Sequence, residues 1–113
     1  TTALPPLNVA WTKFILSRLG GWNDRRERLA EAALRVQAAV RGAGRECPSS
    51  SHIVPFIVGE SNQTILKAED MQRKGFYVLP VRPPTVPEGT SRLRISLTAA
   101  VTEEEVDSLC REL

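Results

Sequence analysis

The stretch RPPTVPEGTSRLRISLT, residues 82–98, joins a proline-rich loop to a segment with regular alternation. From Arg92 to Thr98, apolar Leu93, Ile95 and Leu97 alternate with polar or charged side chains, which predicts a strand that buries one face. Three prolines in 82–88 fix the backbone φ angle repeatedly. We therefore expect a rigid loop that leads into a half-buried strand.

Two more strands and two helices are predicted around this stretch. The apolar runs 52–58 and 76–81 are typical of short strands, and Pro55 within the first favours an edge position or a bulge. Between them we expect a helix over 61–73, capped by Ser61 and ended by Gly75, with its inward residues Ile65, Leu66, Ala68 and Met71. Thr102 and Glu105 form the pattern of a capping box that opens a last helix.

The N-terminal third is predicted to be helical. A first helix from Leu7 to Leu19 has little polar face, so it should be buried on several sides or covered by something else. Asp24 and Glu27 resemble a capping box for a second helix to about Val40, with an apolar stripe of Leu29, Ala33, Val36 and Val40. Gly42 and Gly44 should end it, before the linker CPSSS at 47–51.

These elements predict an α+β fold. Two N-terminal helices should be followed by a β-α-β-β-α small domain, with a mainly antiparallel three-stranded sheet and helices on one side. The composition shift at the linker divides the chain into a helical segment, 1–47, and a small α+β domain, 48–113.

Bulk composition excludes several functional classes. The net charge of +2 is spread along 113 residues without a basic patch, so nucleic acid is not an expected partner. No apolar run is long enough to span a bilayer, and no secretory signal is recognisable, so we expect a cytoplasmic protein. Cys47 and Cys110 lack the spacing of a metal site or a disulfide framework.

Arg94 is the first candidate for chemistry. It lies on the polar face of the predicted strand, beside a rigid loop that offers the hydroxyl group of Thr85. A guanidinium in such a place suits bidentate recognition of a carboxylate. The alternative is that Arg92 and Arg94 are solvated residues that protect a strand edge. The residues alone leave both interpretations open.

Residues 82–87, Gly89-Thr90 and 92–100 resemble the C-terminal signature of the α-oxoamine synthases, pyridoxal-phosphate enzymes of fold type I. The form RPPT at 82–85 resembles, within that family, the branch that makes 8-amino-7-oxononanoate. The resemblance extends to 1–6, 53–59 and 75–78, so it covers nearly the whole chain and is weakest between Trp11 and Ser51. Val101 departs from the pattern, because the family often has histidine there.

The resemblance implies a transferase that is normally a homodimer. It would condense L-alanine with a pimeloyl thioester, carried on coenzyme A or acyl carrier protein, and release carbon dioxide to form a biotin precursor. Arg94 would hold the carboxylate of the amino acid, Thr85 would contact substrate, and Arg82 would support the pocket. Thr2 matches a position near the cofactor phosphate.

The family's Schiff-base lysine has no match in this chain. Lys13, Lys67 and Lys74 lie in predicted helices outside the small-residue setting that the family uses, and His52 is an ordinary strand residue by its context. We therefore expect a C-terminal fragment with no catalytic residue, no activity alone and no bound cofactor, which in the parent enzyme joins a large cofactor domain through 1–47. The alternatives are a standalone carboxylate-binding module and an interaction domain that uses the apolar first helix.

Overall fold

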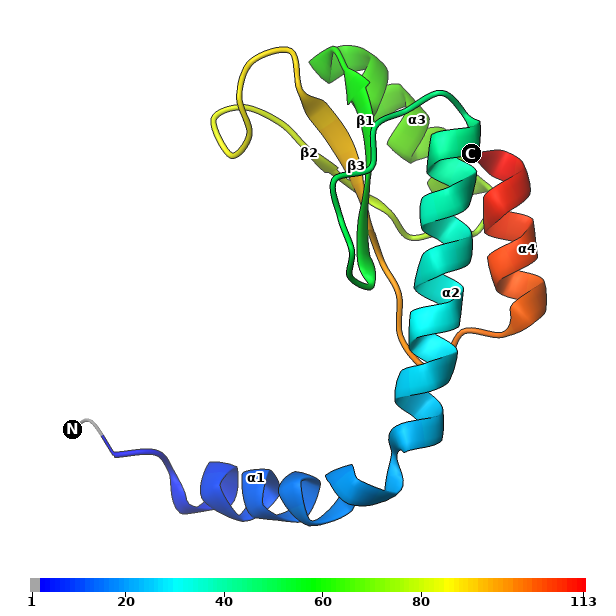
Figure 1. The fold of residues 1–113 in the computed structure, drawn as a ribbon. Coiled ribbons are helices and arrows are strands. Elements are labelled where there is room, and N and C mark those ends of the chain that lie inside the picture. Colours follow the sequence, from blue (N-terminus) through cyan, green and yellow to red (C-terminus); the bar gives the residue numbers. More distant parts are fainter. Residues whose placement is uncertain (1–2) are drawn as a thin grey trace.

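A computed structural model describes residues 3–113 and confirms the α+β class. Helix α1 (Pro6–Arg18) leads through a 3-10 turn (Leu19–Gly21) into α2 (Asn23–Gly42). Strand β1 (Ile53–Gly59), helix α3 (Ser61–Arg73), strands β2 (Leu79–Val81) and β3 (Ser91–Ser96) and helix α4 (Glu103–Glu112) follow. Figure 1 shows the sheet beside α2, α3 and α4, with α1 extending away from them.

The sheet is antiparallel throughout, and β3 is its central strand. The strand order is β1-β3-β2, so β1 is an edge strand, as Pro55 predicted. The register places Pro55 and Leu79 on either side of Arg94. The alternating residues of β3 therefore divide between a covered face and an open face.

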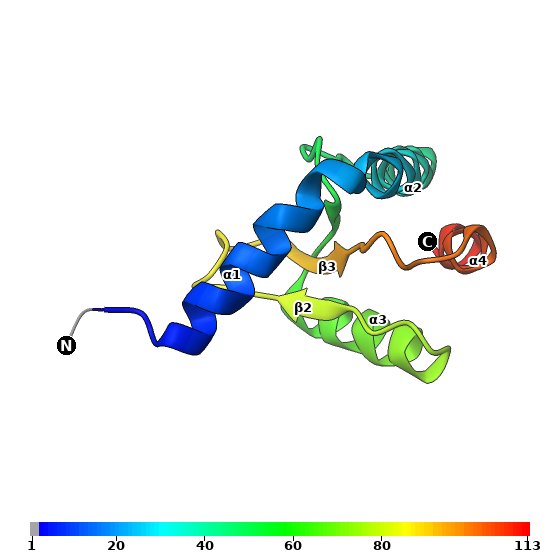
Figure 2. The same ribbon diagram turned by 90° about the horizontal axis from the view of Figure 1, so that it is seen from below.

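The core lies between the sheet and the helices α2, α3 and α4, which Figure 2 shows grouped on one side of the sheet. Leu93 and Ile95 of β3 are buried there, and so are Val54 and Phe56 of β1. The predicted stripe on α2 is confirmed, because Ala33, Val36 and Val40 are buried and Leu29 packs against them. On α3, Ala68 and Met71 are buried as predicted, but Leu66 was predicted wrongly and is 63% exposed, because Thr64 takes the inward position.

Both predicted N-caps upstream of Thr102 are wrong. Helix α2 begins at Asn23, directly after the 3-10 turn, and Trp22 takes the cap position without a side-chain bond, so Asp24 lies within the first turn. Helix α3 is capped by Glu60, whose Oε2 atom accepts a hydrogen bond from the Gln63 amide at 2.8 Å. That bond, followed by the one from the Asn62 amide, lowers the pKa of Glu60.

The second strand is shorter than predicted. Residues 76–78 were expected in it, but the Phe76 amide donates to the Met71 carbonyl at 2.9 Å, which folds this segment back against the end of α3. Gly75 makes the reversal possible with a φ angle of +92°. The third strand runs from Ser91 to Ser96, and one further bond, from the Leu97 amide to the His52 carbonyl at 3.0 Å, extends its pairing.

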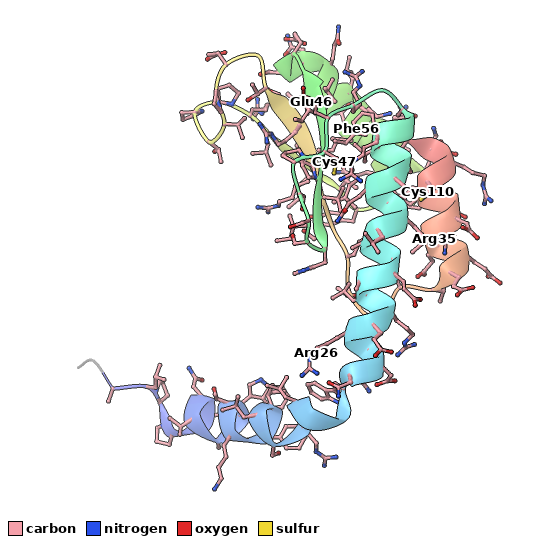
Figure 3. The ribbon with its side chains drawn as sticks, in the orientation of Figure 1. Arg26, Arg35, Glu46, Cys47, Phe56 and Cys110 are labelled. Carbon is pink, nitrogen blue, oxygen red and sulfur yellow. The ribbon has the colours of Figure 1, made fainter. Side chains whose placement is uncertain are left out.

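Helix α1 has no buried residue. The large apolar side chains Leu7, Trp11 and Leu16 are each more than 60% exposed. The radius of gyration is 16.9 Å, whereas a compact chain of this length would have about 13 Å. The difference reflects the position of α1, which meets α2 at a corner (Figure 3), where the Arg26 Nη2 atom donates to the Leu19 carbonyl at 2.7 Å. None of the helices in residues 3–113 is long and apolar enough to cross a membrane.

Candidate carboxylate-binding site

The open face of the sheet carries the candidate site. On this face the central strand β3 presents Arg92, Arg94 and Ser96, because the intervening residues point into the core. Arg92 lies opposite Ile57 of β1 and Val81 of β2, while Arg94 lies opposite Pro55 and Leu79. Each arginine is thus set between two apolar residues of the neighbouring strands.

Arg92 and Arg94 line one shallow groove. Its other lining residues come from the linker and from the two edge strands: Pro48, Ser49, Ile53, Pro55 and Val81. No carboxylate side chain lines the groove, and neither guanidinium forms an ion pair within residues 3–113. Two positive charges in a mostly apolar groove favour the binding of an anion. Because β3 is central, these arginines do not protect a strand edge, although Arg94 is exposed to solvent as that alternative assumed.

Arg92 is held in place by its own turn. Its Nε atom donates to the Thr90 carbonyl at 3.0 Å. Thr90 is fixed in turn, since its hydroxyl group donates to the Pro87 carbonyl at 2.6 Å and its amide to the same carbonyl at 3.2 Å. Arg92 is half-buried, whereas Arg94 is exposed. The sequence placed both residues on the polar face, but it gave no sign that one of them is anchored.

The loop residues predicted for substrate contact lie outside the groove. Thr85 is exposed, and its amide donates to the Arg82 carbonyl at 3.0 Å, which closes a turn. Arg82 is exposed as well, and neither residue is among those that line the groove. The predicted roles of Thr85 and Arg82 stay predictions. Thr2 lies outside the described residues.

The end of this loop lies against the end of β1. Gly59, at the end of β1, has a φ angle of +108°, and a Cβ atom there would lie 3.5 Å from the Gly89 carbonyl oxygen. Gly89 has a φ angle of +74°, a conformation that side chains disfavour. The two glycines bring the loop back onto β1 just before β3 begins.

The three lysines lie in other environments. The Lys74 Nζ atom forms ion pairs with Asp70 at 2.9 Å and with Glu112 at 2.6 Å. Lys67 lies over the ring of Phe56, with Nζ 4.9 Å from its centroid. Lys13 is exposed on α1. None of them lines the groove that contains Arg92 and Arg94.

Cys47 and Cys110, both labelled in Figure 3, are free. Cys110 on α4 faces α2, where its Sγ atom lies 3.9 Å from the Arg35 carbonyl oxygen. Burial raises the pKa of the Cys110 thiol, against the opposing effect of the Arg35 charge. Within residues 3–113, no group of three or more His, Cys, Asp or Glu side chains could hold a metal ion.

Comparison with known families matches residues 1–113 to the family described as aminotransferase class I and II. The 8-amino-7-oxononanoate synthase of Haemophilus ducreyi is 46% identical over 110 residues, which cover 96% of this chain. A high-resolution structure of SPT, a serine palmitoyltransferase, with pyridoxal phosphate is 27% identical with a TM-score of 0.89, over 99% of this chain and 29% of that one.

A solved 8-amino-7-oxononanoate synthase from Francisella tularensis has a TM-score of 0.82 over 98% of this chain and 32% of that one. At 24% identity, this likeness shows the fold alone. The chain spans 28% of the length of the Haemophilus ducreyi relative. The segment that this chain matches is therefore only part of the proteins that it resembles.

Proposed function

The chain belongs to the aminotransferase class I and II family, and on that premise we propose that it is the C-terminal part of an α-oxoamine synthase that makes 8-amino-7-oxononanoate. The parent enzyme condenses L-alanine with a pimeloyl thioester, on coenzyme A or acyl carrier protein, with loss of carbon dioxide, and acts as a homodimer. The identity of 46% to a relative with that name supports the branch of the family.

The observation that carries the proposal is the position of Arg94. It lies at the centre of the open sheet face, in a groove without carboxylates. A guanidinium on a rigid strand can bind a carboxylate through two parallel hydrogen bonds. We assign to Arg94 the carboxylate of the amino-acid substrate, which it would orient for loss as carbon dioxide. Thr85 and Arg82 are proposed to complete the pocket from the loop when the rest of the protein is in place.

Pyridoxal phosphate supplies the electron sink in this chemistry when it is bound. The residues described here do not fit its covalent anchor. Lys74 is engaged by Asp70 and Glu112, and Lys67 and Lys13 lie away from the groove. We therefore place the anchoring lysine outside this chain and assign to these residues the binding of substrate alone, so the chain by itself should be inactive.

The exposed surface of helix α1 also supports a separate domain that holds the cofactor. Its exposed apolar residues on every side are typical of a helix that packs against another domain. We propose that segment 1–47 joins the small domain, 48–113, to a large cofactor domain, and that this domain covers α1.

The test uses the full-length protein that contains this chain, loaded with pyridoxal phosphate. Release of coenzyme A from pimeloyl-CoA in the presence of L-alanine is measured. Arg94→Ala should lower kcat/KM for L-alanine roughly 100-fold, because two charge-assisted hydrogen bonds are lost. Arg94→Lys should restore only part of the loss, because an ammonium group lacks the planar fork.

The matched control is Arg73→Ala, on the exposed surface of α3, where the Arg73 side chain is 77% exposed. It should leave kcat/KM unchanged. Equal values for the two alanine variants would remove Arg94 from the substrate site. A wild-type protein that transferred the pimeloyl group to L-alanine neither from coenzyme A nor from acyl carrier protein would contradict the proposed reaction itself.

A second candidate function is a carboxylate-binding module that works without catalysis. It is favoured by the fact that the groove is formed entirely by residues 48–94 of this chain. Titration of the isolated chain with L-alanine and with dicarboxylates, followed by NMR, distinguishes the two. Saturable binding that Arg94→Ala abolishes supports the module, and absence of binding supports a site that needs the remainder of the enzyme.

A further inference from the structure

Arg92 is a second, separately anchored cation in the groove of Arg94. The two residues are two positions apart on one strand face, so their Cα atoms are about 7 Å apart. Both line the groove, and neither is neutralised by a carboxylate within residues 3–113. One amino-acid carboxylate needs only one of them, so the other cation has no assigned ligand.

The surroundings of Arg92 distinguish it from a solvated surface arginine. The Thr90 carbonyl accepts a hydrogen bond from its Nε atom, and the residue is half-buried. The bond fixes the plane of the guanidinium and leaves its terminal nitrogens free to donate. An arginine ordered in this way loses less conformational entropy when it binds an anion than a mobile one would.

The surface around the two cations is apolar. Arg92 is flanked across the strands by Ile57 and Val81, and the groove also includes Ile53 and Pro55. Methylene groups pack favourably on such a surface, whereas a hydrated polar chain gains nothing there. The groove therefore suits a ligand with an anionic group at each end and an apolar chain between them.

We infer that Arg92 binds the distal carboxylate of a dicarboxylic acyl thioester and selects it over a monocarboxylic one. This inference rests on the proposed function, in which Arg94 holds the amino acid. The new carbon–carbon bond joins the amino acid to the thioester carbonyl, so the two arginines hold the two ends of one growing chain. The apolar side chains that flank the two arginines on β1 and β2 pack against the methylene groups of that chain.

The experiment compares two acyl substrates in the full-length protein loaded with pyridoxal phosphate. Pimeloyl-CoA and heptanoyl-CoA have the same number of acyl carbons and differ in the distal carboxylate. The wild-type protein should have the higher kcat/KM for pimeloyl-CoA. Arg92→Gln should lower the ratio of the two kcat/KM values roughly 30-fold, mainly through KM for pimeloyl-CoA, because a charge-assisted bond is lost. Arg92→Lys, which keeps the charge, should give an intermediate ratio.

The ratio of the two acyl substrates separates recognition from a general structural role. A variant that merely distorts the turn at Thr90 lowers both kcat/KM values alike, and that result would overturn the inference. Equal kcat/KM values of the wild-type protein for the two thioesters would also overturn the inference. This second result does not depend on whether a variant folds. A wild-type protein with no turnover of either thioester would instead contradict the proposed function. Arg94→Ala should reduce turnover of both thioesters, because it acts on the amino acid.

Discussion

The hydroxyl oxygens of Ser61 and Ser91 lie 2.9 Å apart and join the first residue of α3 to the first residue of β3. Ser91 is completely buried, and Ser61 is half-buried. The bond therefore fixes the start of the strand that carries Arg92 and Arg94. A polar pair at this position connects the helix layer to the strand of the candidate site.

Replacement of Ser91 by alanine should destabilise the chain. The Ser61 hydroxyl would lose its partner in a half-buried position, which costs about 1–2 kcal/mol. The double variant Ser61→Ala/Ser91→Ala should cost less than the sum of the single variants, because both partners are then absent. Urea denaturation measures the three free energies. Ser50→Ala, in the exposed linker, is the control, and an equal effect there would contradict the role of the pair.

Leu93 and Leu66 provide a matched test of the core. Leu93 is completely buried on β3, while Leu66 is 63% exposed on α3. Leu93→Ala should lower the free energy of unfolding by roughly 2–5 kcal/mol, through lost burial and the remaining cavity. Leu66→Ala should change it by less than about 0.5 kcal/mol. Similar shifts of the urea midpoint for both variants would mean that the assigned faces are wrong.

The sequence predicted the elements of this fold more reliably than their arrangement. The existence of α3 and its end at Arg73 were predicted, because its apolar spacing and Gly75 are both local signals. Pro55 indicated an edge position for β1, but no local signal decides whether β2 or β3 is the central strand. That gap left open the alternative in which Arg92 and Arg94 protect a strand edge.

The errors at helix starts have a similar origin. Glu60 and Ser61 are adjacent, and both have side chains that can accept a hydrogen bond from a helix amide. The choice between them depends on where β1 ends and on the Ser91 hydroxyl, which already engages Ser61. Thr102, with no competing partner from another element, was predicted correctly.

The sequence predicted part of the candidate site, namely the face of the strand on which Arg94 lies, but not the anchoring of Arg92. Alternation along 92–98 placed Arg94 on the open face, because period-2 patterns determine the two faces of a strand. The anchoring of Arg92 by the Thr90 carbonyl depends on the turn that Pro87 and Gly89 form, and no pattern of residue types specifies that bond.

The capping box of α4 should contribute measurably to stability. The Thr102 hydroxyl accepts from the Glu105 amide at 3.2 Å, and the Glu105 carboxylate accepts from the Thr102 amide at 2.8 Å. Thr102→Ala should lower the free energy of unfolding by about 1 kcal/mol. Thr12→Ala, at an exposed interior position of α1, has no cap to lose and should be neutral or slightly stabilising. The midpoints of thermal denaturation of both variants are compared with that of wild type. An unchanged midpoint for Thr102→Ala would mean that the capping box does not contribute to stability.

Lys74 joins the ends of two helices and should make stability depend on pH in a defined window. Its Nζ atom lies 2.6 Å from Glu112 Oε2 of α4 and 2.9 Å from Asp70 Oδ2 of α3. The bond with Glu112, followed by the bond with Asp70, raises the pKa of Lys74 above 10.5. The hydrogen bond from Lys74 is in turn the main cause that lowers the pKa of Asp70 below 3.8.

The signs of the two shifts define that window. A lowered Asp70 pKa gives stability that is present above pH 3.8 and is lost as pH falls through the folded-state value. A raised Lys74 pKa gives stability that is present below pH 10.5 and is lost as pH rises through its folded-state value. The difference in the midpoint of thermal denaturation between wild type and Lys74→Met should therefore be constant from about pH 5 to about pH 9 and diminish outside that range. Lys13→Met, at an exposed position of α1, is the control and should show no such window. If the difference in midpoint between wild type and Lys74→Met is the same from pH 2 to pH 11, the ion pairs contribute nothing to stability.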